Sequence, residues 1–105
     1  MIARVWRGTT RARDADTYAA YMRGTGSESL AATPGNKGVY MLRRIRDEAA
    51  EFVMISLWES EDAIRGFAGD DIDVAVFFPE DDRYLIEREL TVSHYEVVEQ
   101  RSTLV

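Results

Sequence analysis

The sequence contains no cysteine. Disulfide bonds, thiolate metal sites and a cysteine nucleophile are therefore excluded. Histidine is almost absent too, because His94 is the only one in the chain. A lone histidine lacks partner ligands at a recognisable spacing, so we predict no metal site.

Long apolar runs are also missing, and none approaches the roughly 20 residues that cross a bilayer. The N-terminus shows a strand pattern interrupted by polar residues rather than a signal peptide. We therefore expect a cytoplasmic protein that does not enter a membrane. The net charge of −6 argues against nucleic acid as a partner, because a basic face supplies most of the affinity for it.

At 105 residues the chain has the length of one domain, which we expect to span 1–105. Its apolar periodicity predicts four strands and two helices. The strands are expected at 2–8, 38–44, 51–58 and 92–98, the helices at 13–24 and 60–75, and connections at "TGSES" (25–29) and "EDDRYLIE" (80–87). The order is β-α-β-β-α-β, an α+β, ferredoxin-like arrangement with a four-stranded antiparallel sheet. Residues 101–105 either extend the last strand or reach towards a partner.

Both faces of the predicted sheet are apolar. In 51–58, Phe52 and Met54 point to one side while Val53 and Ile55 point to the other. Two helices can cover only one face of such a sheet. If the other face were exposed to solvent, the strands would alternate apolar and polar residues. We therefore expect the second face to be buried by another copy of the chain, in a homodimer whose sheets face each other.

Three segments, "TPGNKGVYMLRR", "SLWESEDAIRGFA" and "VSHYEVVE", make the chain resemble the antibiotic biosynthesis monooxygenase (ABM) family, whose members form dimeric α/β barrels. The resemblance implies an active site between the sheet and the two helices of each chain. It also implies a monooxygenase that needs no metal or flavin and acts on a small aromatic or polycyclic phenol. No cofactor is then expected. The alternative is a non-catalytic module for small-ligand binding or assembly, with a cleft filled by its own side chains.

Haem-degrading relatives provide a comparison by residue. Their helical tryptophan and iron-ligating histidine match Phe67 and Phe77, and their first-strand asparagine falls at about Trp6. All three are replaced, and phenylalanine cannot bind iron. The resemblance therefore disfavours haem degradation by that route.

Two residues are candidates for catalysis, and each has a structural alternative. His94 is a candidate general base for a phenolic proton, because imidazole titrates near pH 6.5; the alternative is a strand histidine hydrogen-bonded to a neighbour. Arg4 shares a face of the first strand with Trp6. Arg4 either faces the helices, where it stabilises an oxyanion or peroxide, or meets an acid such as Glu96 across the dimer.

Aromatic and sulfur-containing residues are expected to border the pocket, although packing in the core would explain them equally. These candidates are Trp6, Tyr21, Met54, Trp58, Phe67 and Phe77. The acidic segment "PEDDR" (79–83) resembles a carboxylate cluster, but its spacing matches no cation loop. We expect Arg83 to fold back on Asp81 or Asp82.

Overall fold

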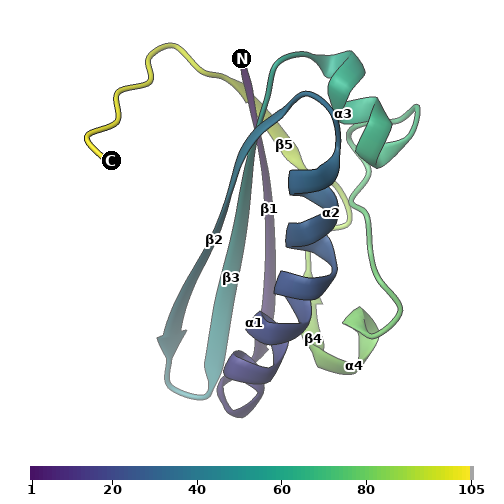
Figure 1. Cartoon of the computed structure of the whole chain (residues 1–105). Helices are drawn as coiled ribbons and strands as arrows, with labels where there is room; N and C mark the ends of the chain where they lie inside the picture. Colours follow the sequence, from purple (N-terminus) through teal and green to yellow (C-terminus); the bar gives the residue numbers. More distant parts are fainter. Residues whose placement is uncertain (105) are drawn as a thin grey trace.

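The computed structural model describes residues 1–104; Val105, and with it the end of the 101–105 segment, lies outside them. Figure 1 shows a sheet with helices on one of its faces. In chain order the elements are β1 (Ile2–Arg11), a 3-10 turn (Ala12–Asp14), α1 (Ala15–Gly24), α2 (Gly26–Ala32), β2 (Asn36–Arg46), β3 (Ala49–Trp58), α3 (Glu61–Ala68), α4 (Asp81–Tyr84), β4 (Leu85–Arg88) and β5 (Ser93–Glu96). Residues 101–104 form neither helix nor strand.

The sheet has the order β2-β3-β1-β4, and β5 also pairs with β1. The pairings are antiparallel. This confirms the α+β, ferredoxin-like class. The predicted fourth strand, at 92–98, is present as the shorter β5. The sheet has a fifth strand, β4, which was not predicted; β4 and β5 pair with successive stretches of the same edge of β1 (Figure 1). No helix within residues 1–104 is long and apolar enough to cross a membrane.

Both predicted connections are wrong in part. The stretch "TGSES" begins a helix, α2, after a break at Thr25, whose backbone angles (φ −124°, ψ −92°) are not helical. The stretch "EDDRYLIE" contains α4 and most of β4 instead of a loop. The buried Leu30 and Leu85 explain both errors, because burial of an apolar side chain outweighs weak local propensity.

The second predicted helix begins as expected but is shorter. Ser60 caps α3, because its hydroxyl oxygen accepts a hydrogen bond from the amide of Ala63 at 3.1 Å. The helix ends at Ala68 rather than at residue 75. Gly69 has a φ of 85°, which glycine adopts readily and which stops the helix. Residues 70–80 then run mostly without regular structure to α4.

The burial pattern of strand β3 shows on which face of the sheet the core lies. Its residues alternate between buried and half-buried along its whole length, as expected for a strand with one covered face. Phe52, Met54 and Trp58 are buried under the helices together with Tyr18 and Met22 of α1. The predicted facing of these β3 residues is confirmed.

The opposite face of the sheet carries apolar residues that the chain itself leaves uncovered. Tyr40 and Leu42 of β2 remain 50% and 46% exposed, and Tyr95 of β5 remains 56% exposed. Val53 and Ile55 lie between them on the same face and are only half-buried. The helices therefore cover one face only, as the sequence predicted.

Candidate functional site

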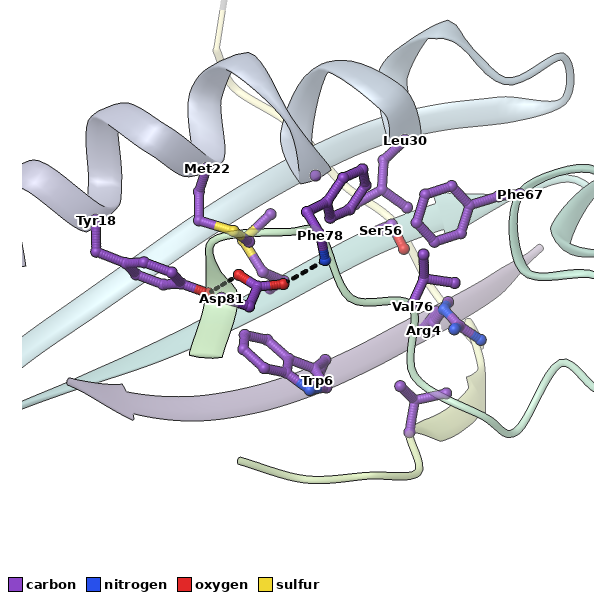
Figure 2. Close-up of a pocket in the computed structure, with 13 residues that line it drawn as sticks. Arg4, Trp6, Tyr18, Met22, Leu30, Ser56, Phe67, Val76, Phe78 and Asp81 are labelled. Carbon is purple, nitrogen blue, oxygen red and sulfur yellow. Dashed lines mark hydrogen bonds between the residues drawn. The ribbon is translucent and has the colours of Figure 1, made fainter. Parts of the chain in front are cut away.

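A small cavity, partly open to solvent, lies between the helix-covered face of the sheet, helices α1 and α2, and the segment that joins α3 to α4. Its volume is about 50 Å³. Figure 2 shows the side chains around it. The lining residues are Arg4, Trp6, Tyr18, Met22, Gly26, Leu30, Met54, Ser56, Phe67, Val76, Phe78, Asp81 and Val92. The lining is mostly apolar and aromatic, so the few polar groups in it define its chemistry.

Tyr18 and Asp81 form one polar end of the cavity. The Tyr18 hydroxyl donates to Asp81 Oδ1 at 3.1 Å, and the amide of Phe78 donates to Asp81 Oδ2 at 2.6 Å (Figure 2). Burial raises the pKa of the Tyr18 hydroxyl, and the charge of Asp81 and its hydrogen bond raise it further. Tyr18 therefore stays protonated and acts as a donor to the carboxylate.

Arg4 lies at the other end of the cavity. It is only 4% exposed. Its guanidinium donates to the carbonyl oxygens of Ile72 and Val74 and lies 3.1 Å from His94 Nε2. Burial lowers its pKa while the nearby Asp73 opposes the shift. Of the two orientations open to Arg4, the structure shows the one that faces the helices.

His94 holds Arg4 in place from the side away from the cavity. Its Nδ1 lies 3.3 Å from Asp73 Oδ1. Burial and the adjacent Arg4 lower the pKa of His94, and Asp73 only partly offsets them. A neutral ring with its proton on Nδ1 satisfies both contacts, because Nε2 can then accept from Arg4. The lone pair that a general base would use is occupied by this contact.

Trp6 forms a wall of the cavity, and a hydrogen bond and a ring contact hold its indole in place. Its indole N–H donates to the carbonyl oxygen of Glu89 at 2.9 Å, and Phe77 packs edge-on against it at 6.2 Å between ring centroids. Gly8, two residues along β1, leaves the space that the indole occupies. A Cβ atom at Gly8 would lie 2.4 Å from Trp6 Cη2, so only glycine is compatible with this ring position.

The structure brings half of the predicted site residues to the cavity. Arg4, Trp6, Met54 and Phe67 line it, whereas Tyr21, Trp58, Phe77 and His94 do not. Trp58 is fully buried and donates its indole N–H to the Ser56 hydroxyl at 2.8 Å. Tyr21 packs beside Tyr18 and accepts a hydrogen bond from the Glu80 amide.

Sequence reasoning missed the polar pair of the cavity. Tyr18 stands at helical spacing with Tyr21 and Met22, so the face of α1 on which it lies was predictable. Its hydrogen-bond partner, Asp81, was not. Asp81 and Asp82 are adjacent in the sequence, yet Asp81 is buried and Asp82 is exposed. Arg83 pairs with Glu80 at 3.2 Å rather than with Asp81 or Asp82, and Arg88 pairs with Asp82. The predicted fold-back of Arg83 is therefore wrong in its partner.

The volume of the cavity limits what fits as it stands. About 50 Å³ holds a few water molecules or a diatomic gas, whereas a cavity that binds benzene measures about 150 Å³. Val76 and Phe78, which lie in the segment between α3 and α4, occupy the remaining space (Figure 2). Within residues 1–104, no group of three or more acidic or histidine side chains is arranged to hold a metal ion.

Solved structures with the same fold include a protein from Bacillus cereus that is provisionally named an antibiotic biosynthesis monooxygenase. It is 18% identical, with 97% of each chain covered and a TM-score of 0.66. MhuD, the haem degrader of Mycobacterium tuberculosis, solved with two haems in its active site, is 16% identical. The match covers 97% of this chain and 100% of that one, with a TM-score of 0.60. A mutant of MhuD with two manganese protoporphyrin IX molecules per active site is 17% identical. The match covers 97% of this chain and 99% of that one, with a TM-score of 0.61.

At these identities the structures establish the fold alone. No curated protein matches the sequence. The family model described as antibiotic biosynthesis monooxygenase matches residues 1–71, which carry β1, α1, α2, the β2–β3 hairpin and α3. The chain therefore belongs to the antibiotic biosynthesis monooxygenase family.

Proposed function

We propose that the cavity is the active site of a cofactor-independent monooxygenase that acts on a small aromatic phenol or enol. The observation that carries the proposal is the composition of the site. An apolar cavity with aromatic walls has a buried guanidinium at one end and a buried carboxylate–tyrosine pair at the other. Family membership supports the same class of reaction.

The reaction in question uses the substrate as the source of electrons. For an anthrone, loss of a proton to water gives an anion that reacts with dioxygen at the former methylene carbon, and the resulting peroxide anion takes up a proton again. Loss of water from the peroxide leaves a ketone. One oxygen atom goes to the ketone and the other to water, while the substrate loses two hydrogens. Such chemistry requires a dry site and a group that stabilises the oxygen-centred anion.

Arg4 is the candidate for stabilising that anion. An arginine has five N–H groups, and Ile72, Val74 and His94 accept from three of those on Arg4. Two remain for a substrate oxyanion or a peroxide. His94, which contacts Arg4 behind the cavity, acts here as a positioning residue and not as the base.

Substrate entry requires space that the structure does not leave open. The Phe78 side chain lies over the cavity, on a segment that has no regular secondary structure. Rotation of the Phe78 ring, with the Phe78 amide still bonded to Asp81, would open the cleft between the sheet and α2 for an aromatic ring. We therefore include closure by Phe78 in the proposal, because closure would also exclude water during the reaction.

We also propose that the protein forms a homodimer through the uncovered face of its sheet. The uncovered apolar face includes Tyr40, Leu42, Val53, Ile55 and Tyr95. Six or so half-covered side chains of this kind, at about 1 kcal/mol each, would contribute about 6 kcal/mol per chain on burial. A second sheet presenting the same face is an apolar surface of matching shape.

Oxygen consumption tests the proposed reaction. Purified protein is incubated with anthrone-type substrates under air, and oxygen uptake is recorded with a Clark electrode. We expect uptake above the spontaneous rate that falls by at least tenfold in Arg4→Met, which keeps the apolar stem and removes the donors. A rate equal to that without protein across a broad panel, or an undiminished rate in Arg4→Met, would contradict the proposal.

A non-catalytic ligand-binding or assembly module is the second candidate, and the volume of about 50 Å³ favours it. It predicts that aromatic compounds bind, or that none does, without any oxygen uptake. Arg4 would then serve only to join β1 to the segment around Ile72 and Val74. The two candidates therefore differ in oxygen uptake measured on the same samples.

A further inference from the structure

Asp81 is a buried carboxylate whose position is not explained by an ion pair. It is only 3% exposed, and within residues 1–104 no arginine or lysine forms a salt bridge with it. The neighbouring acids do have such partners, because Glu80 pairs with Arg83 and Asp82 with Arg88. The chain thus places cations beside the two exposed acids and leaves the buried one without a countercharge.

Leaving a carboxylate in that position is costly unless hydrogen bonds replace the lost water. Two such bonds are present, one from the Tyr18 hydroxyl and one from the Phe78 amide. A carboxylate offers about four acceptor positions, so two remain unused. Asp81 also lines the cavity. A molecule bound there could therefore donate a hydrogen bond to one of the two free acceptor positions.

The carboxylate is held in a fixed orientation. Tyr18, its donor from α1, is fully buried. The Tyr18 ring packs edge-on against Phe52, at 5.0 Å between centroids, and at a tilt against Tyr84, at 5.7 Å. The Phe78 amide fixes the other oxygen from the segment that closes the cavity. Asp81 is therefore positioned from both sides, as recognition groups in binding sites are.

We propose that Asp81 accepts a hydrogen bond from the ligand of this cavity and thereby selects molecules with an O–H or N–H group at their aromatic ring. The proposal rests on the proposed function for the aromatic character of the ligand. It adds a specificity: phenols and enols bind, whereas isosteres without a donor bind weakly. Asp81 and Arg4 lie at opposite ends of the cavity (Figure 2). The donor end of the ligand thus points to α4 and the reacting end to Arg4.

The test compares phenol with toluene, which has nearly the same size and no donor. Binding of each is followed by NMR through the Trp6 indole N–H, which is identified by its loss in Trp6→Phe. The ratio of the two dissociation constants is compared among variants, so the difference in hydrophobicity between the two compounds cancels. A hydrogen bond to a charged group corresponds to about ten- to hundredfold in affinity.

We expect the ratio of the toluene to the phenol dissociation constant to be about ten- to hundredfold higher in wild-type protein than in Asp81→Leu. Asp81→Asn keeps the shape and lowers this ratio by about tenfold. Asp82→Asn, at the adjacent exposed acid, is the matched control and leaves it unchanged.

The proposal is overturned if wild-type protein binds neither compound, or if Asp81→Asn and Asp81→Leu retain the wild-type ratio of the two dissociation constants. Oxygen uptake is recorded separately. A preference that depends on Asp81, without oxygen uptake from any anthrone, would contradict the monooxygenase while leaving the role of Asp81 intact.

Discussion

The guanidinium of Arg4 and the imidazole of His94 lie side by side across neighbouring strands, with His94 Nε2 3.1 Å from an Arg4 nitrogen. The contact is favourable only while His94 is neutral, because protonation would remove the acceptor and place two cations together. Asp73 lies on the other side of the ring, at 3.3 Å, and the charges of Asp73 and Glu61 raise the pKa of His94 against the larger effects of burial and Arg4. Arg4 is thereby oriented by an imidazole whose pKa burial and Arg4 itself hold below its ordinary value.

This arrangement predicts a pH dependence of stability. The pKa of His94 is lowered in the folded protein, so the unfolded chain binds more protons below about pH 6.5. The stabilising contribution is present above that pH and is lost as the pH falls through the lower pKa of the folded state. Urea unfolding of wild-type protein and of His94→Gln between pH 5 and 8 measures it. Because the chain has one histidine, a pH dependence in this range that is identical in the variant would contradict the assignment.

Phe78 is predicted to limit the size of the ligand. Phe78→Ala should enlarge the cavity and speed the oxidation of larger rings several-fold, at a cost of about 1–3 kcal/mol in stability because the side chain is only half-buried. Phe77→Ala is the matched control, because Phe77 packs on Trp6 without lining the cavity. Oxygen uptake with ring systems of increasing size distinguishes the two. Equal changes in both variants would show that Phe78 has no special role.

Gly26 is predicted to keep the cavity open towards α2. A Cβ atom there would lie 3.1 Å from Met22 Cε and 3.6 Å from Phe78 Cε2. Gly26→Ala should therefore weaken the binding of phenol while helix propensity changes by up to about 1 kcal/mol. Gly24→Ala has nothing within 4 Å of its Cβ and should leave phenol binding unchanged. Weakening of equal size in both would argue against a steric cause.

The Ser60 cap is predicted to stabilise the protein by about 1 kcal/mol. Ser60→Ala removes the acceptor that the Ala63 amide uses at 3.1 Å, whereas Ser60→Gly should cost only a few tenths of a kcal/mol. Thermal unfolding of the two variants measures the difference. If alanine proves as stable as the wild type, the hydrogen bond does not contribute.

The uncovered apolar face of the sheet predicts that the chain forms a dimer. Leu42→Glu places a charge among the exposed apolar residues of β2 and should shift the protein from dimer to monomer. Ala20→Glu, on the exposed side of α1, should not. Sedimentation equilibrium at low micromolar concentration distinguishes them. A wild-type chain that is already monomeric and folded at that concentration would contradict the homodimer.

The parts of the fold that were predictable from sequence follow from short-range patterns. The alternation of β3 and the cap at Ser60 are local, and both are present in the structure. The end of α3 was not predicted, because Ile72 and Ala75 continue the helical spacing by coincidence. The positive φ of Gly69 breaks the helix before them. Helix α2 was missed because glycine and two serines near its start suggest a turn, whereas Leu30 anchors it to the core.

The candidate site was less predictable, because its polar pair is formed over a long range. Tyr18 and Asp81 are 63 residues apart in the chain. Nothing in the local sequence distinguishes Asp81 from Asp82; the path of residues 69–80 decides which of them turns inwards. Arg4 and Trp6 were predictable as a pair because alternation in a strand places them on one face.

Strand β2 lies at the end of the sheet order, so its outer backbone groups have no strand partner within residues 1–104. Such an edge can recruit further chains side by side into aggregates. Three arginines, Arg43, Arg44 and Arg46, fall in the last four positions of this strand. Two copies aligned edge to edge in parallel would bring these like charges together. The chain thus carries protection against fibrillar growth on the strand that needs it.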